Sequence, residues 1–297
     1  MAGIVECVPN VSEGRRLDII DGLASVITAT PGVRLLDRTS DPDHNRSVFT
    51  FAGDADAVER AALALIDATY EVVDMRGHTG EHPRLGAVDV VPFVPLAGVT
   101  MEECVAIARR VGETVAARHN IPVFFYAKAA MRPDRVRLPD IRKPEYEGLA
   151  EFLETTHVPD VGPRVLHPSA GAIVIGARPP LIAFNIELDT TDLKLAQRIA
   201  KEIRESSGGL PAVQAKGFML SDPARAQVSM NLLDHTVTSL PTVWREVASR
   251  ASAAGVRILR GELIGLIPLD AALAAAGDAL KLDGFARDRV IEARFLE

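Results

Sequence analysis

The spacing of apolar residues along the chain predicts alternating strands and amphipathic helices. An apolar run at residues 4–9 is typical of a strand, and the polar residues 10–14 after it predict a turn. A predicted helix then presents one apolar face, made of Leu17, Ile20, Leu23, Ala24 and Ile27. The next predicted elements are strands at 33–36 and 48–51, a helix at 55–69 and a strand at 87–94. This β-α-β-β-α-β order is that of a ferredoxin-like unit.

The same order of elements recurs after residue 180. Its predicted members are strands at 181–188, 213–219, 227–232 and 256–267, with helices at 192–206 and 242–253. Side-chain identity between the halves is slight, so the repetition is one of element order. We therefore predict an α+β (α/β) chain of two ferredoxin-like subdomains, at residues 1–178 and 179–297, that arose by internal duplication.

The segment between the halves, residues 132–178, is rich in proline, glycine and charge. Five basic residues lie close together near its start, namely Arg132, Arg135, Arg137, Arg142 and Lys143. Two interpretations remain open. The segment is either a solvated loop with a helix start, or a local positive field that attracts a polyanionic ligand.

The composition restricts the class of protein. Of the 297 residues, 47% are hydrophobic and 25% are charged, which is ordinary for a globular protein. The net charge of −7 argues against a nucleic-acid partner, because phosphate neutralisation needs a basic surface. Cys7 and Cys104 are too few for a disulfide framework or a thiolate metal cage. The sequence shows neither a signal-peptide pattern nor a membrane-length apolar run, so we expect a cytoplasmic protein without a membrane partner.

Residues 78–89 (HTGEHPRLGAVD) combine two histidines, two carboxylates and an arginine next to a predicted strand. A histidine that binds no metal is the usual general acid and base near neutral pH. His82 is therefore the candidate catalytic residue, and a carboxylate at Glu81, Asp89 or residues 41–43 could orient its ring. The alternative interpretation is a structural histidine in a loop.

The same segment matches the H-x-x-E-H pattern of inverted zinc metalloproteases at His78, Glu81 and His82. Such a site needs both histidines on one face of a helix, and Gly80 and Pro83 disfavour a helix here. We therefore predict no metal. The sequence also contains no Gly-x-Ser-x-Gly elbow, P-loop or dinucleotide fingerprint.

Blocks of unusual composition span nearly the whole chain. In the first half they are 6–14 (ECVPNVSEG), 45–51 (NRSVFTF) and 80–89 (GEHPRLGAVD). In the second half they are 176–178 (GAR), 181–185 (LIAFN), 226–234 (AQVSMNLLD) and 263–268 (LIGLIP). Together these blocks resemble the glutamate formimidoyltransferase family and follow its order. The chain departs from the animal members of the family at Lys128, His167 and Ala170.

The resemblance implies transfer of the formimino group from N-formimino-L-glutamate to N5 of tetrahydrofolate, in histidine degradation and one-carbon metabolism. It also implies a homodimer and a folate co-substrate in a cleft between two subdomains. The family's catalytic histidine corresponds to His82. Its folate-binding stretch corresponds to Pro163, Arg164, Val165, Leu166, His167, Pro168, Ser169, Ala170, Gly171 and Ala172.

Both substrates of this family carry glutamate carboxylates, which arginine side chains bind well. We therefore expect substrate contacts near the histidine from Asn10, Asn45, Arg46, Glu81 and Arg84. The two asparagines could instead only tie turns, and the basic cluster at 132–143 could steer the folate tail. Alternative functions are folate-dependent formyl transfer to or from glutamate or another amine, a zinc hydrolase, and a non-catalytic folate-binding protein.

Overall fold

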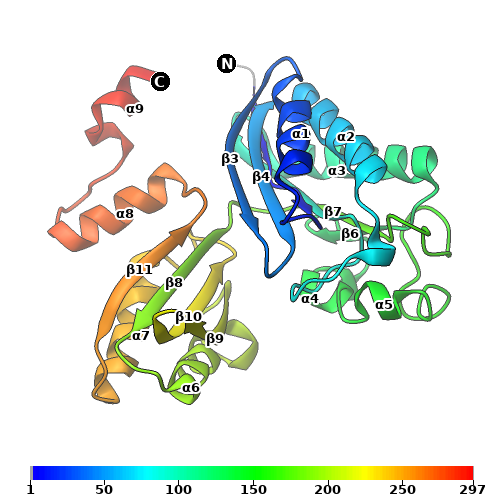
Figure 1. Ribbon diagram of the computed structural model, residues 1–297. Coiled ribbons are helices and arrows are strands. Elements are labelled where there is room, and N and C mark those ends of the chain that lie inside the picture. The colour runs from blue at the N-terminus through cyan, green and yellow to red at the C-terminus, as the bar shows by residue number, and fades with distance from the viewer. Residues whose placement is uncertain (1–2, 297) are drawn as a thin grey trace. The chain divides into compact units, whose positions relative to one another are not determined.

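The computed structural model describes residues 3–296, with side chains up to residue 294, and it divides into two compact units (Figure 1). The first unit ends at Arg178 and the second begins at Pro179. Each unit has its own sheet and its own core of buried apolar side chains. Within residues 3–296, none of the helices combines the length and the apolar character needed to cross a membrane.

A seven-stranded sheet forms the centre of the first unit. Its strands are β1 (Ile4–Cys7), β2 (Asn10–Val11), β3 (Val33–Asp41), β4 (Arg46–Asp54), β5 (Val88–Ala97), β6 (Val123–Ala127) and β7 (Ile173–Ala177). Across the sheet the order is β3, β4, β1 with β2, β5, β7 and β6. The part from β3 to β5 is antiparallel, whereas β7 pairs with both β5 and β6 in parallel.

Successive strand residues point to opposite sides of this sheet, so apolar side chains lie on both faces. Helices cover both faces. On one face lie α1 (Leu17–Thr28), α2 (Ala55–Val72) and α3 (Met101–His119), which bury the main core with residues such as Phe93 and Ile175. On the other face, a second cluster that includes Val90 and Val174 packs against α4 (Leu138–Ile141) and α5 (Glu145–Leu149).

Side-chain caps mark the starts of α2 and α3. The side chain of Asp54 accepts a hydrogen bond from Ala57 N at the start of α2. Thr100 and Glu103 form a capping box before α3. Two short 3₁₀ turns, η1 (Met75–Gly77) and η2 (Pro133–Arg135), connect the longer elements.

The second unit is built on a four-stranded antiparallel sheet in the order β11, β8, β10, β9. Its elements in chain order are β8 (Ile182–Leu188), α6 (Leu193–Ile203), η3 (Glu205–Ser207), β9 (Val213–Ser221), β10 (Ala224–Leu232), α7 (Leu240–Ala253) and β11 (Ile258–Ile264). α6 and α7 bury their apolar sides on one face of the sheet. The chain continues through α8 (Leu269–Leu280), η4 (Arg287–Arg289) and α9 (Ile291–Leu296).

The predicted β-α-β-β-α-β order is present in each unit, with the outer and inner strands in ferredoxin-like positions. This confirms the α+β fold class, while an origin by internal duplication stays a prediction. Two local predictions were wrong. Residues 10–11 belong to β2 rather than to a turn, because their backbone pairs with β4 and β5. Leu17 is 65% exposed, because it is the first residue of α1 and the buried face begins at Ile20.

The first unit also contains elements that the apolar pattern did not assign. These are α3, β6 and β7, which extend the ferredoxin-like core beyond β5. β6 and β7 are parallel and almost entirely buried on both faces. Such strands show no alternation of polar and apolar residues, so the periodicity used for the other strands does not reveal them.

Candidate active site

The segment that carries His82 is a loop at residues 78–87, between η1 and β5, and we call it the histidine loop. It has no helical residue, as Gly80 and Pro83 predicted. Residues 78–83 are exposed or partly buried, whereas residues 84–87 are buried. The first part carries the candidate catalytic side chain, and the buried part anchors it to the sheet.

Arg84 holds the centre of the histidine loop. Its guanidinium donates two hydrogen bonds to Glu147, from Nη2 at 2.6 Å and from Nη1 at 3.1 Å. Its Nε donates to His78 Nδ1 at 3.2 Å, and its Nη2 also donates to His78 O at 3.3 Å. Arg84 is 6% exposed, although the Glu147 side chain reaches solvent. The arginine thus ties the loop to α5.

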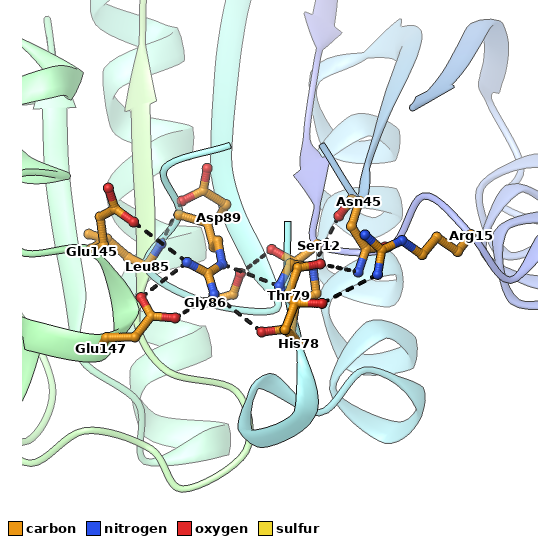
Figure 2. A network of polar contacts seen from close by, with 11 residues as sticks. Ser12, Arg15, Asn45, His78, Thr79, Leu85, Gly86, Asp89, Glu145 and Glu147 are labelled. Carbon is orange, nitrogen blue, oxygen red and sulfur yellow. Dashed lines mark hydrogen bonds and ion pairs between the residues drawn. The ribbon is translucent and has the colours of Figure 1, made fainter. Parts of the chain in front are cut away.

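His78 extends this network to the turn between β3 and β4. Because Nδ1 accepts a hydrogen bond from Arg84, the proton of the neutral ring lies on Nε2, which donates to Asn45 O at 3.0 Å. Burial lowers the pKa of His78, and the nearby Arg84 guanidinium adds to the effect. Figure 2 shows His78 between Glu147 on one side and Asn45 on the other. His78 is therefore a neutral structural bridge.

Asn45 joins three segments of the chain. Its backbone has a φ of 47°, a left-handed conformation that asparagine tolerates better than most residues. The side-chain Oδ1 accepts from Gly14 N at 2.9 Å. Nδ2 donates to Thr79 O at 2.9 Å, as Figure 2 shows. The next residue, Arg46, is thereby placed opposite the histidine loop.

The buried end of the loop is pinned by Asp89 on β5. One carboxylate oxygen accepts from Leu85 N at 2.9 Å, and the other pairs with Arg142. Asp89 is 1% exposed, so this ion pair is shielded from water. Ser12 Oγ adds a hydrogen bond to Gly86 O at 2.8 Å (Figure 2).

His82 itself contacts a cation and no carboxylate. Its Nε2 is in hydrogen-bond contact with Nη1 of Arg46, and within the described residues its buried Nδ1 has no hydrogen-bond partner. Asp41 instead binds His44, at 2.8 Å, so neither Asp41 nor Asp89 orients the His82 ring. Burial and the guanidiniums of Arg46 and Arg142 lower the pKa of His82 to about 3, and the ring is neutral at pH 7.

The predicted folate stretch, residues 163–172, is hydrogen-bonded to the histidine loop. Ala87 N donates to Ala170 O at 2.9 Å, and Ala172 N donates to Leu85 O at 3.0 Å. His167 Nδ1 accepts from Ala170 N at 3.0 Å and closes the turn that precedes this ladder. The structure therefore brings together two segments that are separated by about 80 positions in the sequence. Residues 170–172 are buried, and the exposed part of the stretch is 164–165 and 168.

Gly86 sets how closely these two segments approach, and we expect Gly86→Ala to destabilise the protein by about 1–3 kcal/mol. A Cβ added there would lie 2.2 Å from Ala172 O and 2.3 Å from Ala170 O. Gly77→Ala is a matched control, because nothing lies within 4 Å of its added Cβ. Urea denaturation measures both variants. Equal free energies of unfolding would contradict the tight junction.

The remaining predicted residues make fewer contacts. Asn10 lies in β2, and its Nδ2 donates to Val8 O at 3.1 Å. Glu81 N donates to Asp43 O at 3.3 Å, and Glu81 is exposed. Substrate binding by these residues stays a prediction. Among residues 3–296, no cluster of three or more His, Cys, Asp or Glu has a geometry that could hold a metal ion.

The basic cluster at 132–143 is not an open positive field. Arg135 is 1% exposed and donates from Nη2 to Thr156 O and Val158 O at 3.3 and 3.2 Å. The other members pair with acids, Arg132 with Asp134, Arg137 and Lys143 with Asp140, and Arg142 with Asp89. Neighbouring carboxylates therefore cancel most of the charge, which does not support a role of the whole cluster in steering folate.

For three residues that shape the site, the sequence did not predict the contacts that they make there. Glu147 meets Arg84 across 63 positions, and Arg142 meets Asp89 across 53. His78 was considered only as a metal ligand. The one available signal for Glu147 was its place, with Glu145, in an acidic pair directly after the basic cluster.

Comparison with known proteins identifies the family. Residues 4–178 match the formiminotransferase domain, N-terminal subdomain, and residues 183–283 match the formiminotransferase domain. The glutamate formimidoyltransferase of Streptococcus pyogenes serotype M1 is 45% identical over 286 residues, which cover 96% of each chain. That of Thermoplasma acidophilum is 42% identical over 294 residues, 98% of this chain and 97% of the relative.

Longer proteins match as well. The formimidoyltransferase-cyclodeaminase of Rattus norvegicus is 46% identical over 283 residues, which are 93% of this chain and 52% of the relative. The chain thus spans about half the length of that protein. On the two domain matches and these identities, the chain belongs to the formiminotransferase domain family, and we class it as a transferase.

Proposed function

We propose that this enzyme transfers the formimino group from N-formimino-L-glutamate to N5 of tetrahydrofolate, with His82 as general acid and base. The observation that carries this proposal is a neutral imidazole on the histidine loop, in contact with Arg46. The hydrogen-bonded junction with residues 170–172 supports it, because the family resemblance assigns that segment to folate. The names of the glutamate formimidoyltransferases that match the chain support the same donor.

The chemistry requires one proton to be moved twice. N5 of tetrahydrofolate attacks the amidinium carbon, a bond forms between N5 and that carbon, and the bond from the carbon to the glutamate nitrogen breaks. His82 accepts the proton that N5 loses and then gives it to the departing glutamate nitrogen. The ring returns to its neutral form, and the products are 5-formiminotetrahydrofolate and glutamate. The intermediate carries no oxyanion, so positioning of the substrates matters more than an oxyanion hole.

Arg46 is the best-placed residue for a substrate carboxylate. It lies beside His82, it is partly buried, and within the described residues it has no carboxylate within ion-pair distance. Arg84, by contrast, already forms a two-point contact with Glu147. We therefore assign the donor carboxylate to Arg46 and a positioning role to Arg84. Tetrahydrofolate is a co-substrate in this proposal, and a homodimer and a cytoplasmic location stay predictions.

A panel of donors tests the proposed reaction. Purified protein is incubated with tetrahydrofolate and either N-formimino-L-glutamate or N-formyl-L-glutamate, and the folate product is identified by its absorbance and mass. We expect turnover with the formimino donor and little with the formyl donor, because the carbon of a neutral formamide is a weaker electrophile than that of a protonated formimino group. Turnover with the formyl donor alone would replace this proposal by the formyl-transfer alternative.

A further inference from the structure

Arg46 is a cation whose neighbour is a neutral ring. Its guanidinium contacts His82, and no acid among residues 3–294 lies within 4.0 Å of it. Burial and the nearby Arg142 lower the pKa of Arg46, whereas Asp89 and Asp41 act against this from beyond ion-pair distance. A partly buried guanidinium without an acid partner is costly unless an anion joins it.

The charged and titratable groups around His82 come from several elements. Arg46 begins β4, Arg142 follows α4, and His44 lies in the turn between β3 and β4, with its ring centroid 6.2 Å from that of His82. The opposing charge is that of Asp89 on β5, which is already paired with Arg142. Asp41 acts on Arg46 from the end of β3. Of these basic groups, Arg46 alone has no carboxylate of the described residues in direct contact, because Asp89 is paired with Arg142 and Asp41 with His44.

The contact also occupies the atom that a base must use. A guanidinium has only donors, so Arg46 donates to Nε2 of His82 and the proton of the neutral ring lies on Nδ1. In this arrangement the lone pair of Nε2 is taken, and His82 cannot accept a proton from N5 of folate through that atom. Something must draw Arg46 away before the ring can act as a base.

We propose that a carboxylate of the donor binds Arg46, with Arg142 beside it, and thereby releases Nε2 of His82 as the catalytic base. This inference rests on the proposed function, because it takes the donor to be a dicarboxylate. Arg46 is then a specificity-determining residue that acts on the rate as well as on binding. A donor without the carboxylate would leave the base covered even when it is bound.

Binding of a carboxylate to Arg46 makes His82 a better base through two physical effects. The bidentate attraction of a guanidinium to a carboxylate is stronger than its hydrogen bond to a neutral imidazole, so Arg46 exchanges partners. The anion also offsets the positive charges that disfavour the imidazolium, so the pKa of His82 rises toward the ordinary value of 6.5. A base with a pKa nearer the working pH transfers protons more effectively.

The experiment is a histidine NMR titration of the full chain. The protein carries ¹³C at histidine Cε1, the His82 signal is assigned from the spectrum of His82→Ala, and glutarate serves as the probe. We expect saturating glutarate to raise the pKa of His82 by about 1–3. In Arg46→Gln the pKa should be higher without glutarate, and glutarate should add no further rise. Arg38→Gln is a matched control, because Arg38 on β3 pairs with Asp21, and it should behave as wild type.

The outcomes separate this inference from the proposed function. The inference is overturned if calorimetry shows that glutarate binds while the His82 pKa stays unchanged. It is also overturned if glutarate does not bind, or if glutarate raises the His82 pKa in Arg46→Gln as much as in wild type. Formimino transfer by the wild-type protein, measured on the same sample, decides the proposed function independently. If formimino transfer occurs but glutarate does not raise the His82 pKa, the proposed function stands and the role assigned to Arg46 is wrong.

Discussion

Replacing His82 by alanine is expected to lower kcat for formimino transfer by about 10²–10⁴-fold, the usual contribution of one general acid and base. The variant loses both the acceptor for the N5 proton and the donor for the departing nitrogen. The loop should keep its place, because Arg84, Asn45 and Asp89 hold it through contacts that do not involve the His82 ring. Affinity for tetrahydrofolate, measured by fluorescence or calorimetry, should therefore stay close to that of wild type.

His44→Asn is the control for this prediction. His44 is the histidine whose ring lies beside that of His82, and its side chain is exposed and paired with Asp41. Its replacement removes an imidazole from the same surface and should reduce kcat far less. If His44→Asn loses activity and His82→Ala keeps it, the proton transfer belongs to His44, and its assignment to His82 is wrong.

The second large effect is expected from Arg84→Lys, which should lower kcat by about 10–100-fold with little change in the KM of the donor. Lysine cannot form the two-point contact with Glu147 and also donate in plane to His78. The histidine loop would then shift, and small displacements of a catalytic group have large effects on rate. Steady-state kinetics with both substrates separates kcat from KM.

Arg76→Lys provides a matched comparison for Arg84→Lys. Arg76 lies just before the histidine loop and also binds a carboxylate, that of Asp74, but both side chains are largely exposed. An exposed pair of this kind contributes little to stability, so kcat should stay near that of wild type. If Arg84→Lys instead raises the KM of the donor at an unchanged kcat, Arg84 binds substrate directly, as the sequence first suggested.

The fold was predictable where burial imposes a period on the sequence. The apolar positions Ile20, Leu23 and Ile27 repeat every three to four residues, and all three are buried in α1. β2 was missed because its two residues pair with neighbours on both sides but carry little apolar pattern. Backbone pairing of so short a strand is decided by the strands around it, which no local window of sequence contains.

The site could be predicted from the sequence only in part. His82 stood out because two imidazoles beside a proline and a glycine have no evident packing role, and resemblance to a family pointed to the same residue. The partners of the loop could not be found this way. Glu147 and Arg142 come from a segment that looked like a solvated basic loop, and only the folded chain shows them paired with Arg84 and Asp89.

Isotope transfer decides whether the chain moves a formimino carbon to folate N5 through His82. N-formimino-L-glutamate labelled with ¹³C at the formimino carbon is mixed with tetrahydrofolate and enzyme, and the carbon is followed by NMR. With wild type we expect the ¹³C signal to move from the donor to the formimino carbon of 5-formiminotetrahydrofolate, and with His82→Ala we expect a rate slower by about 10²-fold or more. A label that stays on glutamate with wild type, or that moves equally fast with His82→Ala, would contradict it.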